Sequence, residues 1–90
     1  MNQPKDKPMK LTPKQNMVIY CLQNGWKMLT DQSESGAWIV NEKYEFHINN
    51  GIIWRLMEKT LIGQSLSSPF EFGLTLQGRK IKTKPVTINQ

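Results

Sequence analysis

The sequence predicts a single small α+β domain. Two segments carry apolar residues at helical spacing, and the chain between and after them has β-prone runs separated by polar turns. Its 90 residues support one hydrophobic core at most, because a chain of this length buries only about 60% of its unfolded surface. With 38% hydrophobic and 21% charged residues, the composition is that of a folded domain and not of a disordered chain.

The first helix is expected to begin at Pro13 and to end near Asn24. In the sequence T-P-K-Q, Thr12 is a suitable N-cap, Pro13 suits the first helical position, and Gln15 can complete a capping box. Gly25 then supplies a stop, since glycine readily takes the left-handed conformation that follows a last helical turn. The expected apolar face comprises Met17, Val18, Cys21 and Leu22, with Tyr20 at its margin.

The next two β-prone runs have the pattern of a β-hairpin. W-K-M-L-T and A-W-I-V flank the polar segment D-Q-S-E-S-G, which ends in glycine. The following segment, Y-E-F-H-I, alternates cleanly, with Tyr44, Phe46 and Ile48 on one side and Glu45 and His47 on the other. It is expected to be extended chain, either as a strand or as a loop with buried anchors.

A second helix is expected over about residues 50 to 60. Asn49 or Asn50 can cap it. Its inward stripe comprises Ile53, Leu56, Met57 and Thr60. The runs L-I-G-Q-S-L and P-F-E-F-G-L-T are expected to form two strands joined by S-S-P, and Gln77 and Gly78 interrupt the chain before R-K-I-K.

The two ends are expected to lie outside the domain, which spans residues 11 to 82. Residues 1 to 10 contain two prolines and no apolar periodicity, which predicts a flexible basic arm. Residues 83 to 90 have no partner pattern and are expected to form a flexible tail. No run approaches the ~18 apolar residues that cross a bilayer, and the N-terminal segment lacks the apolar region of a signal peptide, so no membrane partner and a cytoplasmic location are expected.

The net charge of +5 belongs to the ends of the chain. Residues 1 to 14 carry four lysines and one aspartate, and residues 79 to 84 carry one arginine and three lysines. Residues 15 to 78 carry four cations and six acidic residues, a net charge of −2. A basic chain usually indicates a polyanionic partner, but here the expected globular body is weakly acidic.

The order of these elements resembles the winged-helix branch of helix-turn-helix domains. Three segments carry the resemblance: L-T-P-K-Q-x-x-V at the first helix, I-x-x-x-x-I-x-x-L-x-x-x-x-L-I from Ile48 to Ile62, and F-G-L-T-L-Q-G-R from Phe72 to Arg79. They are similar to the first helix, the recognition helix with its following strand, and the second wing strand with its exit. The family usually has another helix where residues 26 to 47 are expected to form a hairpin and extended chain. Small winged-helix-like proteins of bacteria and their mobile elements resemble this variant.

This resemblance implies a DNA-binding, transcription-associated protein that needs no cofactor. The helix at about 50 to 60 would enter a major groove, and the wing at about 64 to 70 and the basic exit would meet phosphates. The residues implied in DNA contact are Asn49, Asn50, Gly51, Arg55, Lys59, Ser67, Ser68, Arg79, Lys80 and Lys82. The same residues also fit a simpler interpretation, in which the asparagines are caps, the charged residues form a solvated helix face, and Ser-Ser-Pro is a turn.

The alternative function is a dimeric protein-interaction domain that keeps the fold without binding DNA. Trp54 lies next to the inward stripe, Ile52 is expected to face outward, and Trp38 is expected to alternate with the core-facing residues of its strand. Aromatic and aliphatic side chains exposed together would suit a protein partner or a second copy of the chain. Each tryptophan taken alone can instead complete a thin core.

No pattern in the sequence indicates an enzyme, a metal site or a small-molecule ligand. His47 and Cys21 are the only histidine and the only cysteine, and they come from different expected elements. Glu42 and Glu45 are close in sequence, but they lie on a hydrophilic connection where carboxylates are usually solvated. Catalytic residues, cofactors and metal ligands are therefore not expected.

Overall fold

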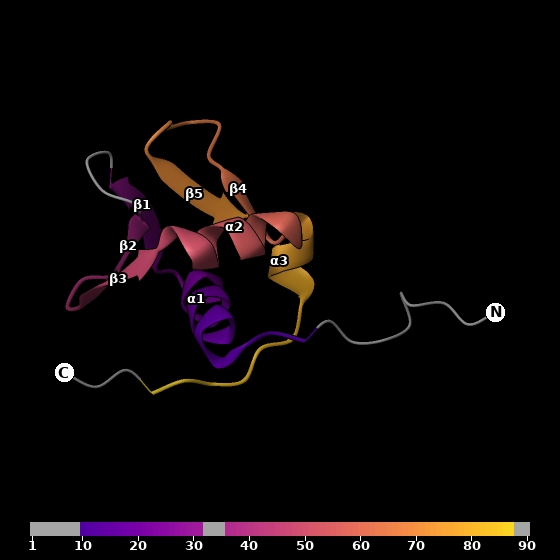
Figure 1. Cartoon of the computed structure of the whole chain (residues 1–90). Helices are drawn as coiled ribbons and strands as arrows, with labels where there is room; N and C mark the ends of the chain where they lie inside the picture. Colours follow the sequence, from indigo (N-terminus) through magenta and orange to yellow (C-terminus); the bar gives the residue numbers. More distant parts are fainter. Residues whose placement is uncertain (1–9, 32–35, 88–90) are drawn as a thin grey trace.

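The structure is a computed structural model that describes residues 10–31 and 36–87 (Figure 1). Its elements are α1 (Pro13–Gln23), β1 (Lys27–Asp31), β2 (Gly36–Val40), β3 (Glu45–Asn49), α2 (Asn50–Glu58), β4 (Ile62–Gln64), β5 (Glu71–Leu74) and α3 (Leu76–Lys80). The predicted α+β class is confirmed. The arm expected over residues 1 to 10 lies, except for Lys10, outside the described residues.

All five strands form one antiparallel sheet with the order β3-β2-β1-β5-β4. The predicted hairpin is present as β1 and β2, and the predicted strand pair after the second helix is present as β4 and β5. The two units are joined because Met28 of β1 pairs with Phe72 of β5. The expectation of a two-stranded wing beside a separate hairpin is thus corrected to a continuous five-stranded sheet.

The helices α1 and α2 pack on one face of this sheet (Figure 1). Side chains alternate along the strands, and the buried ones are Met28, Ala37, Ile39, Ile48 and Ile62. The exposed side chains of the opposite face include Lys27, Leu29, Trp38, Glu45 and His47. As predicted, Phe46 and Ile48 lie on the covered side of β3, whereas Glu45 and His47 lie on the open side.

The start and the end of α1 agree with the sequence prediction. The backbone N–H of Gln15 donates to Thr12 Oγ1, and the N–H of Thr12 donates to Gln15 Oε1, each at 3.1 Å. Gly25 follows the C-cap with a φ of 94°. Ile19 is fully buried although the predicted apolar face omitted it. The reason is that α1 contacts both the sheet and α2, so its buried surface is wider than a single stripe.

The helix α2 begins after the N-cap Asn49 and ends at Glu58. Ile53 and Leu56 are buried as predicted. Thr60, which was expected on the inward stripe, is instead exposed and has a φ of 58°, a left-handed conformation that β-branched residues rarely adopt. The helix thus ends two residues before the expected end near residue 60. Leu61, just before β4, and Ile62, the first residue of β4, are buried in the core.

The short helix α3 was not predicted. The chain around Gln77 and Gly78 was expected to be a break, but it forms a turn of helix whose N-cap Thr75 accepts from the N–H of Gly78 through Oγ1 at 3.0 Å. A Cβ atom on Gly78 would lie 2.1 Å from the carbonyl oxygen of Leu61. Glycine is needed here because it lets α3 approach the backbone that leads into β4.

Candidate nucleic-acid interface

One side of α2 is open to solvent and carries the residues that the sequence associates with DNA. Its exposed residues are Asn50, Gly51, Trp54, Arg55 and Glu58. They recur every three to four positions, so they form one stripe along the helix. Trp54, with 61% of its surface exposed, lies at the centre of this stripe.

Asn49 lies just before this stripe and its side chain already has a partner. Asn49 Oδ1 accepts a hydrogen bond from the backbone N–H of Ile52 at 3.1 Å, which caps the helix. The simpler interpretation of Asn49 is therefore supported. Asn50 is the first residue of the helix itself, and it remains exposed together with Gly51 and Arg55.

The serines of the loop between β4 and β5 form hydrogen bonds within the loop itself. Ser67 Oγ lies 3.0 Å from Ser65 Oγ, and Ser68 Oγ accepts from the backbone N–H of Phe70 at 3.2 Å. Two apolar side chains of this loop, Leu66 and Phe70, also extend into solvent. The predicted phosphate contacts of Ser67 and Ser68 would compete with these local hydrogen bonds.

The end of α2 is hydrogen-bonded to α3. Thr60 Oγ1 donates to Gln77 Oε1 at 3.0 Å, and Thr75 Oγ1 donates to the carbonyl oxygen of Thr60. Lys59 is the C-cap of α2, and Arg79 and Lys80 lie in the last turn of α3. These hydrogen bonds therefore join the helix end that carries Lys59 to the helix that carries Arg79 and Lys80. The structure thus connects these predicted cations through a short network of side chains.

Residues 79–84, which we call the strap, are attached to α1 by two side-chain amides. Gln23 Nε2 donates to the carbonyl oxygens of Gly78 and Ile81 at 2.9 and 2.8 Å, and Thr83 Oγ1 donates to Gln23 Oε1 at 2.7 Å. Asn16 bonds to both backbone groups of Lys84, which donates at 2.8 Å and accepts at 3.0 Å. The segment expected to be a flexible tail is therefore held on α1 as far as Lys84.

The strap, α1 and the residues just before α1 carry cations, and no acidic residue lies in the same segments. Six exposed cations belong to it: Lys10, Lys14, Arg79, Lys80, Lys82 and Lys84. Neither residues 10 to 26 nor residues 72 to 87 contain an acidic residue. The rest of the described chain has four cations and five acidic residues. We call these six residues the basic surface.

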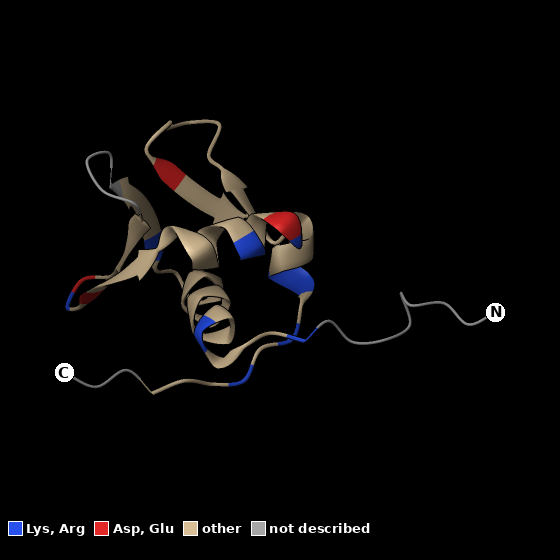
Figure 2. Ribbon diagram, in the orientation of Figure 1, with Lys and Arg blue, Asp and Glu red and all other residues tan. Residues whose placement is uncertain are grey.

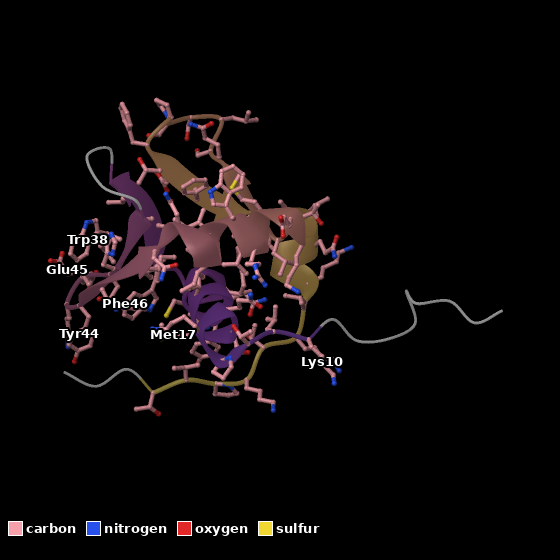
Figure 3. The ribbon with its side chains drawn as sticks, viewed as in Figure 1. Lys10, Met17, Trp38, Tyr44, Glu45 and Phe46 are labelled. Atoms are coloured by element: carbon pink, nitrogen blue, oxygen red, sulfur yellow. The ribbon has the colours of Figure 1, made fainter. Side chains whose placement is uncertain are left out.

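The basic surface lies away from most of the acidic residues. Figure 2 shows blue segments at the start of α1, on α3 and along the chain after α3, on the lower and right side of the view. Red segments mark the β2–β3 loop, the start of β5 and the end of α2. Figure 3 shows Lys10 on the side of the molecule opposite to Glu45. Glu58 at the end of α2 is the acidic residue nearest in sequence to the cations of that helix.

The three residues proposed for protein contact do not form one patch. Trp38 lies on the open face of the sheet, where its ring centroid is 5.0 Å from that of His47 in an edge-on arrangement. Trp54 lies on α2, which packs against the other face. The expectation that Ile52 faces outward is corrected, because Ile52 is half-buried and packs against the core.

Within the described parts of the chain, no group of three or more metal-ligating residues is close enough to hold a metal ion. Cys21 is buried, and this burial raises the pKa of its thiol to about 11. The thiol is therefore neutral near pH 7, which disfavours nucleophilic chemistry. In the same residues, no helix has the length and apolar content needed to cross a membrane.

Comparison with protein families, with curated proteins and with solved structures gave no match to this chain. We therefore infer its function from its own charge and geometry.

Sequence patterns did not reveal the attachment of the strap. Asn16 and Gln23 are seven residues apart, two turns on the same face of a helix. Two amides at this spacing, on the helix that also carries the apolar residues of the core, are the signal that could have indicated a polar contact along its length. Lys10, Lys14 and Lys84 were counted in the charge of the ends but were not assigned to a site.

Proposed function

We propose that this chain binds double-stranded DNA and acts in transcription or a related process. The observation that carries the proposal is the separation of charge: six exposed cations lie in segments without an acidic residue. A patch of one sign attracts the phosphate backbone and raises the rate of association with it. The cations Arg55 and Lys59 of α2 lie on an element that is bonded to α3, which carries part of this surface.

We further propose that the fold is a winged-helix variant in which β2 and β3 occupy the place of the family's second helix. Support comes from the capped first helix, from α2 as the helix before a strand pair, and from the β4–β5 pair itself. In this arrangement α2 is the groove-facing helix. Asn50, Gly51 and Arg55 approach the bases, and Lys59 contacts a phosphate.

The test of this function is duplex binding at low salt, where electrostatic attraction is strongest. Replacing Arg55 and Lys59 with alanine should weaken binding by about tenfold or more, if either contacts a base or a phosphate. The free energy of unfolding should change by no more than about 0.5 kcal/mol per substitution, because Arg55 is exposed and Lys59 is only half-buried. Fluorescence anisotropy with a labelled duplex measures the affinity.

The matched control replaces Lys27 and Lys43 with alanine. Both lysines are exposed, and replacing them removes the same charge. Lys43 lies beside Glu42 and Glu45 in the sequence, and Lys27 belongs to β1, which ends at Asp31. Binding that falls equally in both double variants would reflect net charge and not a site on α2. A full-length chain that does not bind duplex DNA even at low salt would contradict the proposal.

A second candidate function is protein association through α2, favoured by the exposure of Trp54. Arg55 and Glu58 flank this tryptophan on the same stripe. If two copies of α2 pack antiparallel, Arg55 of one copy lies near Glu58 of the other, which gives a self-complementary interface. Tryptophan and arginine are the residues that most often dominate binding energy at protein interfaces.

A further inference from the structure

The chain that follows α3 presents its lysines at a regular spacing. Between residues 81 and 84, Lys82 and Lys84 are exposed, whereas Ile81 and Thr83 are half-buried. This alternation is that of an extended chain, in which side chains at i and i+2 lie on the same side and about 6.6 Å apart. Thr83 donates to Gln23 of α1, so the lysines project away from that contact.

The position of these lysines is fixed before any ligand arrives. Gln23 makes three hydrogen bonds to the chain between Gly78 and Thr83, and Asn16 makes two to Lys84. A free tail would lose conformational freedom when its cations bind a polyanion. The strap does not lose this freedom, because its backbone is already bonded to a helix.

The cations of the basic surface have no competing partner among the residues that the structure describes. None of them forms an ion pair there. Lys14 lies in the first turn of α1, the helix to which the strap is attached. Positive charge is therefore contributed by the strap and by the helix beneath it.

We propose that the strap, together with the start of α1, is a preformed surface for the phosphate backbone of double-stranded DNA, and that Asn16 and Gln23 are its positioning residues. The proposal rests on the proposed function and adds a sequence-independent contact separate from the exposed stripe of α2.

The chemistry of this surface favours a phosphate backbone over a protein partner. The large hydrophobic side chains that are exposed are Leu29, Trp38, Trp54, Leu66, Phe70 and Leu76. None of them lies in α1 or in residues 79–84. Protein interfaces usually need aromatic or aliphatic anchors at their centre, whereas backbone recognition of DNA needs mainly cations.

The first test compares the salt dependence of duplex binding in two double variants of the full-length chain. One is Lys82→Gln with Lys84→Gln, and the matched control is Lys27→Gln with Lys43→Gln. A plot of the logarithm of the association constant against the logarithm of the salt concentration has a negative slope. Each lost phosphate contact makes this slope shallower by about 0.9 and weakens binding about eightfold at 0.1 M salt. We expect the slope of the strap variant to be shallower by about 1.8 than that of the unaltered chain, and the slope of the control to be unchanged. Equal losses in both variants would overturn the proposal.

The second test removes the positioning contact without changing the charge. Asn16→Ala should weaken duplex binding severalfold, and its effect should nearly disappear in a chain that already carries Lys84→Gln. A purely structural role would make the two effects additive. Thermal unfolding measured in parallel shows whether the variant is folded. Asn16→Ala that binds duplex as tightly as the unaltered chain would overturn the positioning role.

The outcomes also separate this proposal from the function on which it rests. Duplex binding that depends on Arg55 and Lys59 but not on Lys82 and Lys84 would leave the proposed function standing and remove the strap from it. Absence of duplex binding at low salt would remove both. If polyglutamate at the same charge concentration competes with the duplex as well as unlabelled duplex does, the surface binds acidic protein and the proposal is wrong.

Discussion

At the scale of single residues, Cys21 shows how burial in the core changes the pKa of a titratable side chain. Only 1% of its surface is exposed, and it packs among the buried residues of α1. Burial disfavours the charged thiolate and raises the pKa of the thiol from 9.0 to about 11. The folded chain therefore keeps a proton that the unfolded chain releases above pH 9.

This difference predicts a loss of stability at alkaline pH. Above pH 9 the unfolded state binds fewer protons than the folded state, so the free energy of unfolding falls as the pH rises toward 11. We expect Cys21→Ala to show a smaller loss between pH 8.5 and 10.5 than the unaltered chain, when urea unfolding is measured at each pH. Every other residue is the same in the two proteins, so its contribution cancels in the comparison. An equal loss in both would show that Cys21 does not contribute.

The polar side chains divide into those whose partners are predictable from sequence and those whose partners are not. Thr12, Gln15 and Asn49 bond to backbone groups three residues away, and the sequence contains both members of each pair in one short window. Asn16 and Gln23 bond to groups that are 55 to 68 residues away. Nothing in a local window shows such a partner, so the attachment of the strap emerges only from the folded structure.

At the scale of elements, the packing of α3 depends on one glycine. The helix has only five residues, too few for an apolar periodicity to be detected, which is why the sequence indicated a break. Its position is set by the approach of Gly78 to the carbonyl group of Leu61 and by the contact of Thr75 with Thr60. These contacts place the strap beside α1.

Gly78→Ala should therefore destabilise the chain, because its Cβ would meet backbone atoms that cannot rotate away. We expect a loss of about 1–3 kcal/mol in the free energy of unfolding, the usual cost of overpacking. The matched control is Gly73→Ala, since a Cβ there meets nothing within 4 Å. That variant should be neutral or more stable by about 0.4–1 kcal/mol. Urea denaturation of both variants gives the comparison, and equal effects would contradict it.

The strands were predictable from β-prone runs, turn residues and, at β3, alternation, but their assembly into one sheet was not. Two β-prone runs on either side of a polar segment indicated β1 and β2, alternating side chains indicated extended chain at β3, and the turn S-S-P between two further runs indicated β4 and β5. The pairing of Met28 with Phe72 joins segments that are far apart in the sequence. A residue pattern shows which side of a strand is buried, but it does not show which strand lies beside it.

At the scale of the whole molecule, two different surfaces are available to partners. The basic surface is rich in cations, whereas the opposite end of the molecule presents Trp38 and Glu45 (Figure 3). The stripe of α2 combines features of both surfaces, because it carries a cation, Arg55, an acidic residue, Glu58, and an exposed tryptophan, Trp54. If copies of the chain associate through this stripe, DNA contact is left to the basic surface.

Association through α2 makes a prediction for sedimentation. We expect a concentration-dependent rise in mass that is weakened at least about thirtyfold by Trp54→Ala, since loss of a central tryptophan usually costs about 2 kcal/mol or more. Trp38→Ala, on the open face of the sheet, is the matched control and should leave association unchanged. A monomer throughout the accessible concentration range would contradict the second candidate function.

The attachment of residue 84 to residue 16 also has a consequence for how the chain folds during synthesis. Helix α1 is made early, but the last groups that cover its polar side are those of Lys84. The same is true of β1, whose neighbour β5 is made after α2. The N-terminal third of the chain therefore cannot complete its contacts until residue 84 has been synthesised, and native structure should form in one late, cooperative step dominated by distant contacts.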